Sequence, residues 1–157
     1  MTNDQEDQTM RTLALAAVAA SLLAVPALAN DKAIEARQGH FKLLGANMGA
    51  LAAMAKGEVE YDAKKAQTHA DNLFHLSKTN IGFLFVPGTD SSAMSGKTRS
   101  KKEIWDNFPE FGEKAGALAG AVAMLQTEAG KGRAELGKAL GQTGGTCKAC
   151  HDSFREK

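Results

Sequence analysis

Apolar residues recur at helical spacing along the chain after residue 30. Between residues 31 and 56, steps of three, four and seven residues separate Ile34, Phe41, Leu44, Met48 and Leu51. This spacing predicts an amphipathic helix. We expect that helix to begin with Asp31 as its N-cap and to end at Gly57.

Comparable patterns predict three more helices, over residues 62–79, 108–129 and 131–155. A short helical piece at residues 102–107 is expected before the third of the four, which has Pro109 in its first turn, where the missing N–H of proline costs nothing. The predicted inner stripe of this helix consists of Phe111, Ala115, Leu118, Val122 and Leu125.

Residues 80–101 interrupt the helical pattern. The segment is rich in Pro, Gly, Ser, Thr and Asp, which favour turns, and a loop of this length in a compact domain tends to be functional. The other joints, at residues 57–61 and 130, are short, so neighbouring helices should pack antiparallel. Aromatic residues are only 6% of the chain, and many good helix formers favour an all-α fold. The sequence therefore predicts an antiparallel up-down four-helix bundle.

The segment before residue 30 has the features of a secretory signal peptide. Arg11 precedes an apolar run at residues 13–25, and small residues follow it just before Asn30, as in a leader with a charged region, an apolar region and a cleavage site. An uncleaved N-terminal anchor is the alternative, but the run is shorter than the ~20 apolar residues of a membrane span.

The acidic residues at the start of the chain are unusual for a leader. They all precede Met10, which we therefore expect to be the true start of translation. Residues 1–29 should be removed by cleavage near Ala29-Asn30, which leaves residues 30–157 as an exported, periplasmic domain. No membrane span is expected in the processed protein.

Charge excludes one class of function. The chain carries 19 basic and 18 acidic side chains, for a formal net charge of +1. A nucleic-acid-binding domain would show a clustered basic surface, so no nucleic-acid partner is expected.

The two cysteines of the chain lie in one pentapeptide, Cys147-Lys148-Ala149-Cys150-His151. On a helix, Cys147, Cys150 and His151 stand at i, i+3 and i+4, and therefore share one face. Cys-x-x-Cys-His is the attachment signal for c-type haem: two thiols add to the haem vinyl groups while the imidazole meets the iron. The sequence thus predicts one covalently attached haem c, with Cys147 and Cys150 as its anchors and His151 as the iron ligand.

Two other interpretations of the cysteine pair remain open. A redox dithiol is expected in a βαβ context, which the helical pattern does not offer. A structural zinc site needs four ligands, and the remaining histidines, His40, His69 and His75, show no matching spacing.

With these motifs the chain resembles a known family, the class II c-type cytochromes and specifically cytochrome c′. The resemblance covers residues 31–157 and rests on the following features: Arg37-Gln38, Pro87-Gly88-Thr89, Thr98-Arg99, Glu103-Ile104-Trp105 and the terminal haem motif with Arg155. Cytochrome c′ is itself an example of the up-down four-helix bundle, so the resemblance and the helical pattern imply the same fold.

The resemblance also implies roles for individual residues. Arg37 and Gln38 would lie near the haem propionates, Thr98 would contact the haem edge, and Arg155 would lie beside the proximal pocket. Phe41 would cover the distal face of the iron, and because an aromatic ring cannot ligate iron, the iron would be five-coordinate and high-spin.

The function implied is one-electron transfer by a periplasmic mono-haem cytochrome that is not an enzyme. Its partners would be redox proteins, together with the small gases NO and CO at the open iron position, and it would form a homodimer through its first two helices. The alternatives are a haem-dependent NO-scavenging or peroxidase enzyme, and a low-spin class II cytochrome with a methionine sixth ligand. Met48 lies about two turns, roughly 10 Å, from Phe41 and is poorly placed for that role.

Overall fold

The computed structural model describes the backbone from Asn3 to Lys157 and the side chains from Asn30 onward. The predicted signal peptide, residues 1–29, therefore lies outside the residues whose side chains are described. Within the described backbone, six helical elements occur in this order: α1 (Asn3–Lys56), α2 (Ala63–Ser77), η1 (Gly82–Leu84), α3 (Glu103–Asp106), α4 (Phe108–Glu128) and α5 (Arg133–Phe154). Among the described residues, none of these helices is both long and apolar enough to cross a membrane.

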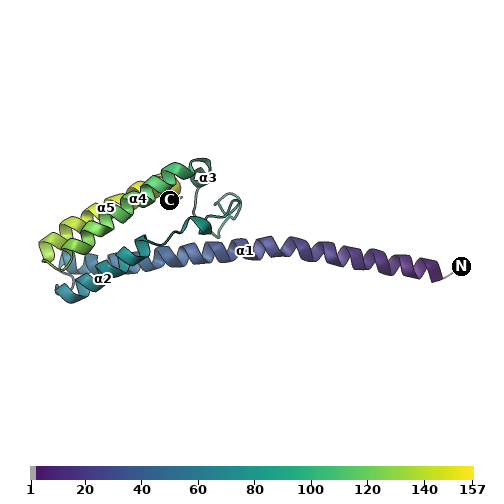
Figure 1. The fold of residues 1–157 in the computed structure, drawn as a ribbon, viewed down its shortest axis with the longest axis horizontal. Helices are drawn as coiled ribbons and strands as arrows, with labels where there is room; N and C mark the ends of the chain where they lie inside the picture. The colour runs from purple at the N-terminus through teal and green to yellow at the C-terminus, as the bar shows by residue number, and fades with distance from the viewer. Residues whose placement is uncertain (1–2) are drawn as a thin grey trace.

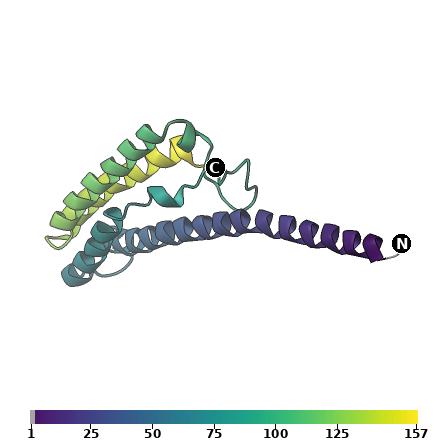
Figure 2. The same cartoon turned by 45° about the vertical axis from the view of Figure 1, so that its right-hand side comes forward.

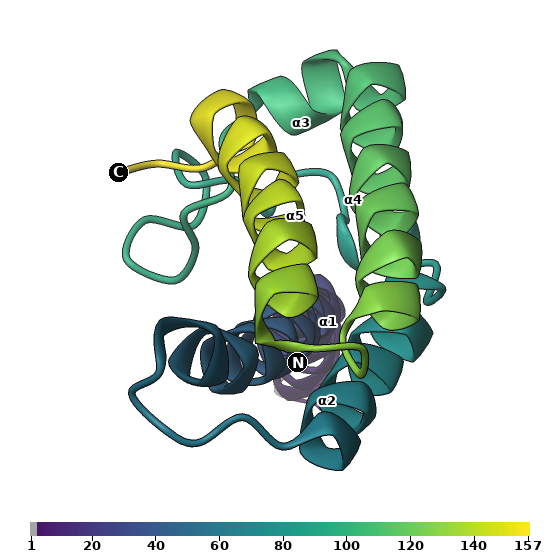
Figure 3. The same cartoon turned by 90° about the vertical axis from the view of Figure 1, so that its left-hand side faces the viewer.

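The four long helices form the predicted bundle. Helices α1 and α2 make one antiparallel pair and α4 and α5 make another, and each pair contacts the other through α1 with α5 and α2 with α4. The pairs converge at the end that carries the α1–α2 and α4–α5 joints, and they diverge toward α3 (Figures 1, 2 and 3). The long segment between α2 and α4 crosses the diverging end, where the C-terminus also lies.

The first helix begins far upstream of its predicted start. It runs through Asp31, so the prediction that Asp31 is an N-cap was wrong. The residues before Asp31 are rich in Ala and Leu, strong helix formers, and they continue the helix. The Asp31 carboxylate instead pairs with Lys97 Nζ at 2.8 Å. The end of the helix is as predicted, with Gly57 at φ 77°, in the left-handed region that favours glycine.

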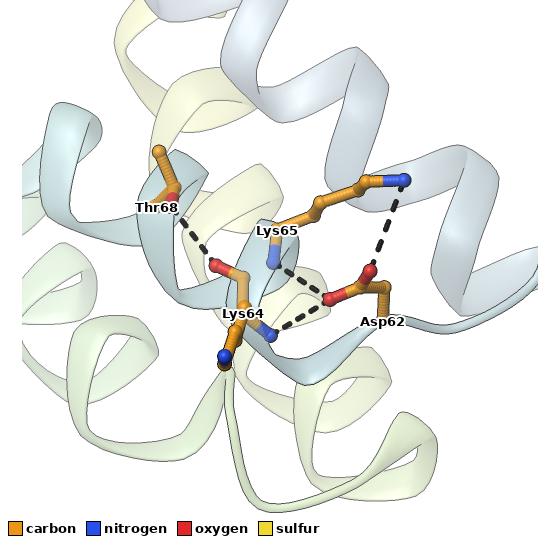
Figure 4. A network of polar contacts seen from close by, with 4 residues as sticks. All are labelled: Asp62, Lys64, Lys65 and Thr68. Carbon is orange, nitrogen blue, oxygen red and sulfur yellow. Dashed lines mark hydrogen bonds and ion pairs between the residues drawn. The ribbon is translucent and has the colours of Figure 1, made fainter.

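Helix α2 begins close to its predicted start, and Asp62 is its N-cap. One carboxylate oxygen accepts hydrogen bonds from the backbone N–H of Lys64 at 2.9 Å and of Lys65 at 3.0 Å, and the other lies 3.8 Å from Lys65 Nζ (Figure 4). These N–H groups would otherwise have no intrahelical partner. The cap therefore fixes where α2 starts after its short joint with α1.

The third long helix has the predicted two-part form. Asn107 ends α3 and caps α4, where its side chain accepts from the N–H of Glu110, and Pro109 occupies the first turn. Phe111, Val122 and Leu125 of the predicted inner stripe are buried and Leu118 is partly buried, but Ala115 is exposed, which the prediction had wrong.

The buried core consists of two separate clusters. The joint-end core draws on all four long helices: Leu44, Leu51 and Met54 of α1, Ala66, Ala70 and Leu73 of α2, Val122, Leu125 and Ala129 of α4 or its end, and Leu136, Ala139 and Leu140 of α5. The loop-end core is smaller and consists of Phe85, Ile104, Phe111 and Phe154. Apolar burial thus closes the bundle at both ends.

The joint-end core should dominate stability. Leu125 is fully buried within it, so Leu125→Ala should lower the free energy of unfolding by about 2–5 kcal/mol. Met124, its neighbour on the same helix, is 50% exposed, and Met124→Ala should change stability by less than about 1 kcal/mol. Urea unfolding of the two variants measures both values, and equal losses would contradict this account of the core.

The Asp62 cap should make stability depend on pH. The hydrogen bond from the N–H of Lys65 is the main cause that lowers the Asp62 pKa in the folded protein. The contribution of the cap to stability is therefore complete above the ordinary carboxyl pKa, and it is lost as the pH falls through the lower folded pKa. The amide oxygen of Asp62→Asn can cap without titrating. The difference in stability between the native protein and this variant should therefore be largest near neutral pH and should shrink below about pH 4, as measured by urea unfolding across that range. A difference that is constant with pH would contradict it.

Candidate haem-binding site

The predicted haem motif lies on the last turns of α5, next to the loop-end core. Cys147 and Cys150 are free thiols of intermediate exposure, and Cys150 packs against the loop-end core. His151 is exposed. All three residues lie within one continuous helix, which runs through Gly144 and Gly145 without interruption, so the i, i+3, i+4 arrangement predicted from the sequence is present.

Burial shifts the pKa values of all three side chains. Burial raises the pKa of the Cys147 thiol and of the Cys150 thiol, and for Cys150 the positive charge of Lys114 partly opposes that rise. Burial also lowers the pKa of the His151 imidazole, helped by the positive charge of Arg99. Near neutral pH the cysteines are therefore thiols, and the imidazole is neutral with a lone pair available to a metal.

The core of the bundle is interrupted at the level of this motif. No residue is buried over residues 144–153 of α5, over residues 112–120 of α4, or over residues 38–43 of α1. On α4 and α5 the stretch lies between the joint-end core and the loop-end core. On α1 it lies between Leu44 of the joint-end core and the buried Arg37. The chain leaves its own interior incompletely covered where the motif projects, which fits a large apolar group held there.

On α1, the interruption of the core falls at Phe41. Arg37 and Leu44 stand one turn before and after it on the same helix face and are buried at 2% and 9% exposure, but Phe41 is 40% exposed. Its predicted place in the stripe is thus correct, but no side chain of the described residues covers it as a core residue would be covered. Met48, the alternative iron ligand, packs against the joint-end core instead.

Arg37 is fully enclosed beside the loop-end core. Its guanidinium donates to Thr89 Oγ1 at 2.7 Å, to the Thr89 carbonyl and to Thr98 Oγ1 at 2.8 Å, and it lies over the Phe85 ring, 5.2 Å from the centroid. Burial lowers the Arg37 pKa, and the nearby Asp90 carboxylate opposes that effect. A buried cation needs such hydrogen-bond acceptors, so this contact fixes the loop onto α1.

The loop residues 86–101, here named the strap, are joined to α1 at two further points. Gln38 Nε2 donates to the Lys97 carbonyl at 2.7 Å, and Lys97 Nζ pairs with Asp31. The family resemblance assigned Arg37, Gln38 and Thr98 to the haem surroundings. The structure brings these three residues together where the strap contacts α1.

The strap is also joined to the residues that follow the motif. The N–H of Lys101, the last residue of the strap, donates to the Phe154 carbonyl at 3.0 Å, and the N–H of Glu156 donates to the Arg99 carbonyl at 2.8 Å. Arg155 forms a backbone bridge with Ser100. The strap thus ties α1 to the end of α5, immediately after the haem motif.

Arg155 lies beside His151, as the resemblance implies. Its Nη1 atom is 3.5 Å from His151 Nδ1. Trp105 donates from Nε1 to the Phe85 carbonyl at 2.9 Å and so fastens the loop before the strap to α3.

Thr89 and Lys97 are contact residues that the sequence analysis did not identify. Thr89 is completely buried, and it belongs to the Pro-Gly-Thr sequence that carried part of the resemblance. The signal that could have found it is the buried arginine itself, because a guanidinium on an apolar helix face requires oxygen acceptors from another segment.

The zinc interpretation gains no support from the surroundings of the cysteines. Within the part of the chain whose side chains are described, no group of three or more His, Cys, Asp or Glu residues could hold a metal ion. The cysteine pair therefore finds no further ligands for a closed zinc site there.

Comparisons with known proteins agree on one family. The family model for cytochrome c′ matches residues 32–155. A cytochrome c′ of Cereibacter sphaeroides is 44% identical over 149 residues, which cover 94% of this chain and 99% of the relative.

Solved structures give the same result. A cytochrome c′ from Rhodobacter Spheriodes matches with a TM-score of 0.79 at 45% identity, over 82% of this chain and 98% of that one. A cytochrome c′ with a ligand-controlled dimer dissociation matches with a TM-score of 0.75 at 32% identity, over 82% and 97%. A nitric oxide complex of a mutant cytochrome c prime from Alcaligenes xylosoxidans matches with a TM-score of 0.70 at 29% identity, over 82% and 97%.

The match along nearly the whole domain, together with a terminal Cys-x-x-Cys-His on the last helix of a four-helix bundle, leads to one conclusion: this chain belongs to the cytochrome c′ family of class II c-type cytochromes.

Proposed function

We propose that this protein is an exported one-electron carrier that holds a single covalent haem c with an open iron position. The observation that carries the proposal is the interrupted core, in which α1, α4 and α5 all lack buried residues at the level of Cys147 and Cys150. A compact bundle does not leave such a level uncovered unless another group fills it. When bound, haem supplies an iron that alternates between Fe(III) and Fe(II).

Three residues of α5 hold the group in this proposal. Cys147 and Cys150 form thioether bonds to the two vinyl groups, and His151 is the proximal iron ligand. Burial keeps the thiols protonated and the imidazole neutral near neutral pH, because it raises the cysteine pKa values and lowers the His151 pKa. Arg155, 3.5 Å from His151 Nδ1, orients that ring.

The strap and α1 provide the polar side of the site. Arg37, Gln38 and Thr98 lie together next to the strap, and we assign to them the neighbourhood of the propionates and the haem edge. In this assignment Arg37 acts in two ways: its charge complements the carboxylates of the group, and its hydrogen bonds to Thr89 keep the strap in place.

Phe41 defines the distal side. It lies on the inner face of α1 at the level of the motif, and its ring offers no lone pair to iron and no proton to a bound ligand. We infer a five-coordinate, high-spin iron with an apolar distal side, able to bind NO and, more weakly, CO. The nitric oxide complex of the related Alcaligenes xylosoxidans protein supports this inference.

An enzyme using the same haem is the less supported alternative. Peroxidase or NO-scavenging turnover relies on a distal group that donates or accepts protons, and the side chain on the inner face of α1 at this level is Phe41. The low-spin alternative needs Met48 at the iron, but Met48 packs against the joint-end core. We therefore assign a carrier function with redox proteins as partners.

Export and assembly complete the proposal. Cleavage near Ala29-Asn30 would release residues 30–157 into the periplasm, where haem can be attached. A homodimer through α1 and α2 is supported by the dimeric relative and by Leu43, which is 56% exposed on α1 among several small residues.

Covalent attachment can be tested with the two thiols. The protein matured in a host competent for haem attachment should show a Soret band that survives acid–acetone extraction. Cys147→Ser and Cys150→Ser should each lose one of the two bonds, and the double variant should release all haem on extraction. A colourless native protein with two titratable thiols would contradict the proposal.

The open iron position can be tested with gases. The reduced protein should change its visible spectrum on addition of NO and of CO, because no side chain occupies the sixth position. Phe41→Met places a thioether on the distal side and should give a low-spin spectrum with at least about tenfold weaker CO binding. Leu43→Met, on the exposed face of the same helix, is the matched control and should behave like the native protein. A native spectrum unmoved by either gas would contradict the open site.

A further inference from the structure

A shallow hollow of 420 Å³ lies next to the proposed iron ligand. It is lined by His151, by the carboxylates Asp152 and Glu156, and by four cations, namely Arg99, Lys101, Arg155 and Lys157. We name this surface the His151 hollow. The gas-binding side at Phe41 belongs to α1, whereas this surface is formed by the end of α5 and residues 99–101.

The four cations of the hollow are not neutralised by the chain. In the region with described side chains, none of them forms an ion pair, although six other lysines do. Lys101 Nζ donates to a carbonyl, that of Asp152, at 3.4 Å, and Arg155 approaches the uncharged His151 ring. The Asp152 carboxylate is paired with Lys148 at 2.5 Å. The surface around His151 therefore keeps an excess of positive charge.

The two backbone segments that carry the cations are joined to each other before any partner arrives. Arg99 and Lys101 lie on one backbone segment and Arg155 and Lys157 on the other. The two segments are hydrogen-bonded to each other, from Glu156 N to the Arg99 carbonyl at 2.8 Å and from Lys101 N to the Phe154 carbonyl at 3.0 Å. Fixed backbones reduce the ordering cost of binding.

The arrangement suits a broad acidic surface better than a small anion. A small anion seated in the hollow would meet Asp152 and Glu156 as well as the cations, and the cations come from two chain segments that surround the hollow. An acidic protein surface can instead place several carboxylates around the rim, and transient electron-transfer interfaces are small.

We propose that the His151 hollow is the surface where electrons enter and leave the protein, and that the partner docks there with an acidic patch. This inference rests on the proposed function, because it takes His151 as the iron ligand. His151 is exposed, so a partner seated on the hollow lies against the ligand of the iron. The positive rim steers such a partner and raises its association rate at low ionic strength.

The test compares oxidants of opposite charge. The reduced haem protein is mixed in a stopped-flow instrument with hexacyanoferrate(III), an anion, or with tris(phenanthroline)cobalt(III), a cation, at low and high ionic strength. The double variant Arg99→Glu/Lys101→Glu should slow the anionic oxidant roughly tenfold at low ionic strength and should speed up the cationic one. The double variant Lys64→Glu/Lys138→Glu has the same change in net charge on exposed lysines of α2 and early α5, and it should leave both rates within about twofold of the native values.

The opposite responses separate steering from other effects. A changed reduction potential would move both rates in the same direction, and a damaged haem site would alter the visible spectrum, which tests the proposed function separately. Equal effects of the two double variants, or rates independent of ionic strength in a protein with a normal haem spectrum, would overturn the proposal.

A competition arm identifies the kind of partner. Polyglutamate, as a probe for an acidic protein surface, should slow the reaction with hexacyanoferrate(III) in the native protein and not in Arg99→Glu/Lys101→Glu. Inorganic phosphate at equal ionic strength should be much less effective. Phosphate that competes as well as polyglutamate would show a small-anion site instead and would overturn the assignment of a protein partner.

Discussion

Apolar surface inside a helix bundle must be covered, and in this molecule the chain covers it at two ends but not between them. The joint-end core uses side chains from all four long helices. The loop-end core uses Phe85, just before the strap, and side chains of α3, α4 and α5. At the intervening level three helices have no buried residue. Because protein interiors are packed as densely as organic crystals, this uncovered level is where the proposed function places the haem, beside the two thiols and the imidazole.

The buried Arg37 determines how the open end is organised. A guanidinium enclosed in protein is stable only when oxygen atoms surround it, and the strap supplies them through Thr89 and Thr98. The same strap pairs with the backbone after the haem motif. Arg37, together with Gln38 and Asp31, therefore fastens the strap to α1, and through it the end of α5.

Much of this could be predicted from the sequence because it depends on local spacing. The motif at Cys147 needs only five residues, and the helix end at Gly57 follows from a short-range rule. Predictions failed where the burial or the contacts of a residue depend on a segment distant in the sequence. Periodicity assigned Ala115 to an inner stripe, but Ala115 is exposed because it lies at the interrupted level. Asp31 has the right chemistry for an N-cap, yet the helix continues upstream and its carboxylate pairs with Lys97 instead. The contact of Arg37 with Thr89 joins residues far apart in sequence, and no local rule gives such a pairing.

The division of the core into two clusters bears on the order in which the molecule is assembled. The cluster at the joint end needs nothing beyond the polypeptide, so a newly exported chain can already hold its four long helices in register there. Its two sulfur atoms meanwhile remain partly accessible at the other end. If the group is attached as proposed, the joint-end core can therefore form independently of that attachment.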